Sequence, residues 1–141
     1  MSFANPAWAF HFMPAATKFG GTAPATLSFG NSITCSAAWA FKTNRTGSKA
    51  KITRVSFSNI SGDCGEVHAV GLPWTVVPTT GGTASIMAMS LNFSGQGINR
   101  GPGDFPITVS GGSISFNAPL NPGGCNFSGT IPASPAISIG P

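Results

Sequence analysis

The chain has 141 residues, of which 41% are hydrophobic, seven are Lys or Arg and three are Asp or Glu, for a net charge of +4. Disordered chains are rich in charge and poor in apolar residues, so this composition excludes disorder and predicts one folded domain with its own core. No apolar run of about 18 residues is present, which excludes a membrane-spanning helix. A surface of Ser, Thr and Asn with so little charge gives weak repulsion between copies and favours self-association.

The hydrophobic pattern predicts an all-β chain with essentially no helix. One Glu and one Gln in the whole sequence leave no window with the residues and the 3.6-residue period of a helix. Short segments instead alternate apolar and small polar residues between Gly, Pro and Asn. We expect a single-domain antiparallel β-sandwich of roughly nine to ten short strands.

The N-terminal segment is unusual because Trp8, Phe10 and Phe12 fall on one face of a predicted strand. We therefore separate residues 1–14 from a sandwich domain of residues 15–141. The aromatic rings could cover the chain's own core. Alternatively, the strand adds to the sheet of a neighbouring subunit, which would make these three residues the subunit contact and join copies head to tail into filaments.

A basic stretch follows, and it holds five of the seven positive residues: Lys42, Arg45, Lys49, Lys51 and Arg54. A solvated, charged hairpin is the simplest interpretation. With so few acids to offset it, the stretch could instead attract an anionic cell surface, a polysaccharide or nucleic acid. Nucleic acid is not an expected partner, because the aromatic residues hardly interleave with the basic ones.

Three of the chain's five Asp, Glu and His residues lie around Cys64. Asp63, Glu66 and His68 are its neighbours in sequence, and such a loop could in principle form a thiol nucleophile or a metal site. A polar turn beside a disulfide explains these residues better, and the common phosphate-binding, nucleophile-elbow and zinc-protease motifs are missing. We predict no enzyme, no metal and no cofactor.

The clearest strand spans residues 83–93, where Met87, Met89, Leu91 and Phe93 alternate with small or polar residues and are expected to share the buried face. Similar alternation predicts strands at residues 27–29, 33–35, 37–41, 53–57, 67–70, 74–77, 105–109, 114–118, 125–127 and 137–139. Turns are expected at the Gly pairs 20–21, 81–82, 111–112 and 123–124.

Three cysteines, Cys35, Cys64 and Cys125, cannot all pair within one chain. A Cys35–Cys64 disulfide would close a loop of about 30 residues and stabilise the fold by roughly 3.5 kcal/mol. Three buried free thiols are the alternative. The start of the sequence has neither a basic segment nor an apolar segment of a signal peptide, and we expect that one has been removed from a secreted protein.

Several short motifs together resemble one protein family. They are Ile33-Thr34-Cys35 before an aromatic strand, Ser61-Gly62-Asp63-Cys64-Gly65, Gly71-Leu72-Pro73-Trp74, Gly101-Pro102-Gly103, and residues 123–130 running into residues 134–139. In order and spacing, from about residue 27 onward, they resemble the secreted bacterial proteins named for PraB, the activator of alkane oxidation.

The resemblance implies a secreted protein that is tied to the cell surface and to growth on hydrocarbons, without catalytic residues. Members of the family carry a further cysteine where this sequence has Arg100. If the family's cysteines pair first with second and third with fourth, Cys35–Cys64 remains and Cys125 loses its partner. An unpaired Cys125 could also link two chains.

Two functions follow as hypotheses. The first is a secreted or cell-surface structural protein that assembles itself into extracellular filaments or biofilm matrix by strand donation. The second is a surface-active or apolar-ligand-binding protein that assists alkane utilisation, because a Phe-rich sandwich could hold an apolar ligand between its sheets. The first is the main hypothesis, since low charge and an aromatic end strand both favour self-assembly.

Overall fold

The fold is that of a computed structural model that describes residues 10–28, 32–61, 64, 67–93, 98–120 and 125–140. Those residues form antiparallel β-strands and no α-helix, which confirms the all-β prediction. No helix in the described ranges is long and apolar enough to cross a membrane. The strands are β1 (His11–Met13), β2 (Lys18–Ser28), β3 (Ser32–Thr43), β4 (Ala50–Ser61), β5 (Val67–Ala69), β6 (Trp74–Thr80), β7 (Thr83–Phe93), β8 (Ile98–Ser110), β9 (Ser113–Leu120), β10 (Cys125–Pro132) and β11 (Ser138–Gly140).

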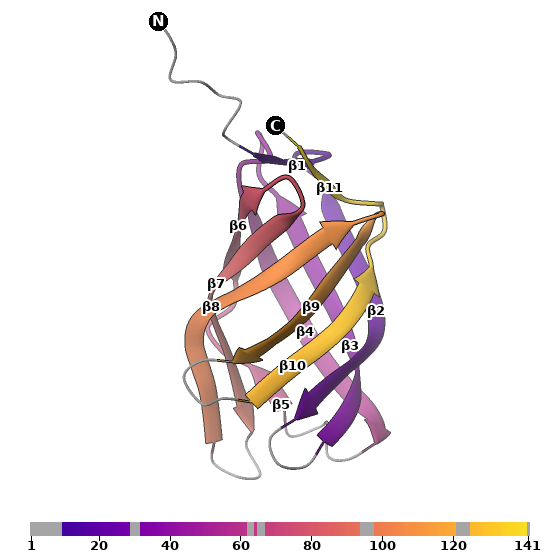
Figure 1. Cartoon of the computed structure of the whole chain (residues 1–141), viewed down its shortest axis with the longest axis vertical. Coiled ribbons are helices and arrows are strands. Elements are labelled where there is room, and N and C mark those ends of the chain that lie inside the picture. Colours follow the sequence, from indigo (N-terminus) through magenta and orange to yellow (C-terminus); the bar gives the residue numbers. More distant parts are fainter. Residues whose placement is uncertain are drawn as a thin grey trace, which may run out of the picture.

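Eight of these strands close into a barrel (Figure 1). From β2 to β10 they pair in chain order, with β5 set aside against β7, and β10 then pairs back with β2, where Phe127 lies opposite Leu27. The predicted sandwich is therefore wrong. Side chains alternate between inside and outside in a barrel as they do in a sandwich. Here a single sheet coils until its two edges meet, because strands of 11 to 13 residues such as β2, β3 and β8 twist far enough.

Aromatic side chains fill the middle of the barrel. The rings of Phe116 and Phe127 lie 4.7 Å apart between centroids, and Trp39 and Phe105 pack against both at 5.8 to 6.2 Å. Such pairs stabilise a core beyond the area they bury. They make the interior a packed core over most of its length, as expected for a barrel of this size.

The two ends of the described chain form a separate small sheet across one end of the barrel, in which β1 pairs with β11 (Figure 1). We call β1 and β11, with Ile137 beside them, the cap. Phe12 and Ile137 are only 2% and 1% exposed, so both side chains are buried. The cap therefore covers the mouth of the barrel with apolar side chains from both chain ends.

A bulge in β7 explains one wrong prediction. Ala84, Ile86, Met89 and Leu91 are buried, whereas Met87 is 38% exposed and does not share their face. The register between β7 and β8 shifts between Ile86 and Met89, and Ala88 adopts a φ of 54°. The extra residue resets the alternation, which puts Met87 outside. The side chain of Phe93 lies outside the described part.

The glycine pairs have different roles. Pairs 81–82 and 111–112 form turns, as predicted, but Gly20 and Gly21 lie within β2. A Cβ at Gly21 would come within 2.5 Å of Ile131 Cγ2 and of the carbonyl oxygen of Pro132. Gly21 therefore allows two chain segments to approach closely, and this pair does not form a turn. Pair 123–124 lies outside the described residues.

The structure contains the predicted Cys35–Cys64 disulfide, with a Cα–Cα distance of 5.7 Å. Both residues are fully buried. The bond ties the segment after β4 to β3, and it requires an oxidising environment to form and persist. Nothing is described for the side chain of Cys125.

Candidate functional site

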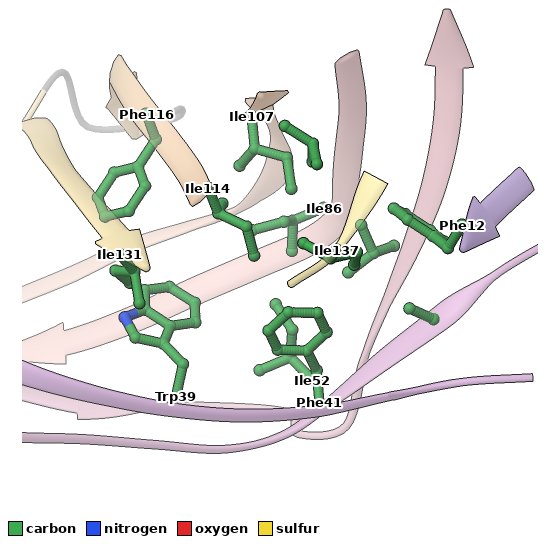
Figure 2. Close-up of a pocket in the computed structure, with 13 residues that line it drawn as sticks. Phe12, Trp39, Phe41, Ile52, Ile86, Ile107, Ile114, Phe116, Ile131 and Ile137 are labelled. Atoms are coloured by element: carbon green, nitrogen blue, oxygen red, sulfur yellow. The ribbon is translucent and has the colours of Figure 1, made fainter. Parts of the chain in front are cut away.

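A small cavity of about 20 Å³ lies inside the barrel under the cap (Figure 2). Its lining consists entirely of hydrophobic residues, four of them aromatic: Phe12, Trp39, Phe41 and Phe116. The other lining residues are Ala50, Ile52, Val76, Ile86, Ile107, Val109, Ile114, Ile131 and Ile137. Every barrel strand except β2 contributes inward-facing apolar side chains to this lining, and the cap contributes the rest. Together they form one continuous apolar surface.

Trp39 carries a polar side-chain atom, which does not contribute to the surface of the cavity. The indole nitrogen of Trp39 is buried and has no hydrogen-bond partner among the described residues, and the whole side chain is 7% exposed. By contrast, the indole N–H of Trp74 donates to the carbonyl oxygen of Val70 over 2.8 Å. The cavity surface therefore offers dispersion contacts alone, which is the chemistry that a saturated hydrocarbon can use.

The cavity in its closed form is much smaller than the 300 to 1,000 Å³ or so of typical small-molecule pockets. Figure 2 shows Phe12 reaching in from β1 beside Ile137. These two side chains occupy the mouth of the barrel. Moving the cap outward would remove both and extend the space above Phe41 and Ile86.

A backbone hydrogen bond joins the cap to the hairpin between β3 and β4. The amide of Phe12 donates to the carbonyl oxygen of Gly47 over 2.7 Å. Behind it, the buried hydroxyl of Thr43 donates to the carbonyl oxygen of Pro14 and accepts from the amide of Thr17, both at 3.0 Å. β1 and β11 share a ladder with each other and none with the barrel strands. The barrel ladder can therefore stay intact while the cap moves.

A second feature is an open hollow of about 650 Å³ on the outer surface beside the cap. We call it the basic hollow. Four of the five predicted basic residues line it, namely Lys42, Arg45, Lys49 and Lys51, with Thr43, Asn44, Thr53, Thr75, Ala16 and Ala50. Arg54 is exposed on β4 outside that lining. The hollow thus concentrates the basic stretch around one concave surface.

Three lysines form a row across the strands next to this hollow. Lys18 on β2 is the register partner of Lys42 on β3, and Lys42 is also the partner of Lys51 on β4. All three are exposed. Lys18 lies outside the basic stretch in the sequence, and only the register of β2 against β3 brings it there.

The N-terminal aromatic segment is described from Phe10 onward, and Trp8 lies outside the described residues. Phe12 covers the chain's own core, which was one of the two interpretations. The ring of Phe10 is half-buried and lies near Gly81. Donation of this segment to a neighbour stays a prediction, as does its separation from residues 15–141.

The loop around Cys64 is described only in part, since Asp63 and Glu66 lie outside the described residues. The sulfur of Cys64 is bonded to that of Cys35, so Cys64 is not the thiol nucleophile considered above. His68 is exposed on β5. In the described ranges, no three His, Cys, Asp or Glu residues are grouped as a metal site would need.

Comparison with known proteins gives one family. Residues 1–141 match the family described as alkane oxidation protein activator PraA/PraB-like, which confirms the resemblance found in the motifs. No curated protein and no solved structure matches the chain.

Proposed function

Because the chain belongs to the alkane oxidation protein activator PraA/PraB-like family, we propose that it is a secreted, non-enzymatic accessory protein that binds an alkane-type apolar chain inside its barrel. The observation that carries this proposal is the continuous apolar lining under a cap that shares no ladder with the barrel. The family description, which names an activator, agrees with a role beside an oxidising enzyme.

The cap supplies the access route. A two-stranded sheet of three residues per strand is marginal by itself, so the cap is expected to open at a lower free energy than the barrel. When it opens, Phe12 and Ile137 leave the mouth, and an alkyl chain can take their place against Phe41 and Ile86. Burial of the ligand's apolar surface drives binding.

Secretion is supported by the disulfide. Such bonds persist in oxidising compartments and are rare in the cytosol. The Cys35–Cys64 pair is fully buried and forms part of the core, so the fold is suited to an extracellular or periplasmic location.

Self-assembly by strand donation has less support than ligand binding. Closure through β10 and β2 joins the sheet edges, although some neighbouring strands pair over only part of their length: β4 pairs with β6 over Ala50–Ile52, and β8 with β9 over Thr108–Ser110. What disfavours strand donation is therefore the position of Phe12 rather than the absence of sheet edges. Phe12, one of the three proposed anchors, would have to leave its own core to enter another subunit.

The test is binding of linear alkanes from octane to hexadecane, followed by the thermal unfolding temperature and by quenching of tryptophan fluorescence with 1-bromoalkanes. We expect alkanes to raise the unfolding temperature, since a ligand that binds only the folded state stabilises it. Bromoalkanes should quench Trp39, which lines the cavity, and the variant Trp39→Phe should lose that quenching while Trp74 remains.

A pair of variants sharpens the test. Phe12→Ala should lower the free energy of unfolding by about 3–5 kcal/mol without ligand. An alkane should then raise the free energy of unfolding more in this variant than in the parent, because it fills the enlarged space. Met87→Ala, which removes an exposed side chain, should bind like the parent. Lowered oil–water interfacial tension without stabilisation or quenching in any variant would instead indicate adsorption and reject the interior site.

A further inference from the structure

We propose that the basic hollow binds an acidic polysaccharide through the carboxylates of its sugar units. This inference rests on the outer surface and is independent of the apolar interior. It assigns a ligand to a site that combines the row Lys18, Lys42 and Lys51 with the cations of the β3–β4 hairpin, Arg45 and Lys49.

The row is unfavourable unless an anion binds it. Lys42 has a like charge as its direct partner on both sides, and like charges opposite each other destabilise a sheet. Asp104 is the single acid that the structure describes, and its carboxylate accepts from the amide of Ala88 on β7. In the described residues no acid neutralises the row, and a bound polyanion would do so.

The shape and chemistry of the hollow fit a polymer of hydroxylated, acidic units. Neighbouring strands place register partners about 5 Å apart, so the row presents charges at short, repeated intervals. Asn44, Thr53 and Thr75 add amide and hydroxyl groups to the same lining, and such groups can bond sugar hydroxyls. The lysines supply point charges for the carboxylates.

Two other anionic partners fit less well. Proteins that bind single-stranded nucleic acid stack bases on aromatic rings, and none of the described residues that line the hollow is aromatic. A membrane surface favours a flat basic face with large apolar side chains that insert, whereas the lining has two alanines as its apolar residues.

The experiment measures binding of the full chain to polygalacturonate, with dextran as the neutral polymer. DNA and phosphatidylserine vesicles are the competing anions. Polygalacturonate should bind at about 0.01 M salt and dissociate at about 1 M, where the screening length is short. Dextran should not bind. Tighter binding of DNA or of the vesicles, or no binding of polygalacturonate at low salt, would overturn the proposal.

Matched variants localise the site. Lys42→Gln should weaken polygalacturonate binding about fivefold, and Lys42→Gln with Lys51→Gln roughly twentyfold. The control Arg100→Gln removes the same charge from β8, which lies four strands from β3 in either direction around the barrel, and should bind like the parent. Equal losses in Lys42→Gln and Arg100→Gln would mean that net charge alone governs binding and would refute the site.

Discussion

The amide of Phe12 in the cap donates a 2.7 Å hydrogen bond to the carbonyl oxygen of Gly47 in the hairpin between β3 and β4. Gly47 has a φ of +78°, and a Cβ at this position would collide with the carbonyl oxygen of Phe12. The hairpin that carries Arg45 and Lys49 is therefore also the support of the cap.

Substitution of Gly47 should loosen the cap. Gly47→Ala combines a left-handed backbone, which costs about 1–2 kcal/mol for Ala, with the collision against Phe12. Gly71→Ala is the control, because Gly71 has the same φ of +78° and open space around its Cβ position. Urea unfolding should show the larger loss for Gly47→Ala, with faster hydrogen exchange at the Phe12 amide. Equal losses in the two variants would argue against the contact.

A disulfide within the cap should slow alkane binding if the cap opens by separation of β1 from β11. Met13 and Ser138 are exposed register partners on β1 and β11, so Met13→Cys with Ser138→Cys can link the two strands. The background carries Cys125→Ser to prevent mispairing. Bromoalkane quenching of Trp39 should become much slower in the linked protein.

The control for that disulfide is Ser28→Cys with Ser32→Cys. These two residues are register partners at the other end of β2 and β3, far from the cap. The control protein should bind like the parent. Unchanged quenching in the cap-linked protein would mean that opening does not require β1 and β11 to separate: the cap moves as one unit, or the ligand reaches the interior by another route.

Removal of the native disulfide should destabilise the fold strongly. The bond closes a loop with a sequence separation of 29, and its loss should lower the free energy of unfolding by roughly 3.5 kcal/mol. Cys35→Ala with Cys64→Ala should therefore unfold at a much lower urea concentration than Cys125→Ser. If both variants unfold at the parent's midpoint, the bond adds no stability.

Relief of the lysine row should stabilise the protein while weakening polysaccharide binding. Lys42→Gln removes two like-charge pairs and should raise the free energy of unfolding by a few tenths of a kcal/mol at low salt. Lys49→Gln removes a cation that has no register partner in the row and should change stability less. A loss of stability in Lys42→Gln would contradict the repulsion on which the anion site is based.

The local alternation of residues was enough to predict the strands, and the β7 strand has the predicted bounds of residues 83–93. The alternation could not predict that the sheet closes into a barrel. Leu27 and Phe127 are far apart in sequence, and their pairing is what distinguishes a barrel from a sandwich. The cysteine positions allowed the correct pair to be proposed, with the family resemblance as support.

The two candidate sites were only partly visible in the sequence. The basic stretch was evident as a cluster, but Lys18 joins it through register alone. Phe12 was recognised as an aromatic anchor, and its position under the cap depends on pairing between the two chain ends. Met87 was misplaced because a bulge at Ala88 leaves no mark in the apolar pattern.

Ala50 belongs to the lining of both the interior cavity and the basic hollow. One small residue of β4 thus separates the proposed alkane from the proposed polysaccharide, and the hairpin beside it holds the cap. If a polysaccharide bound there favours the closed cap, thermodynamic linkage requires that an alkane weaken polysaccharide binding by the same factor. Polysaccharide binding and alkane binding would then oppose each other. Protein without an alkane would stay bound to the polysaccharide, and protein with an alkane would dissociate from it.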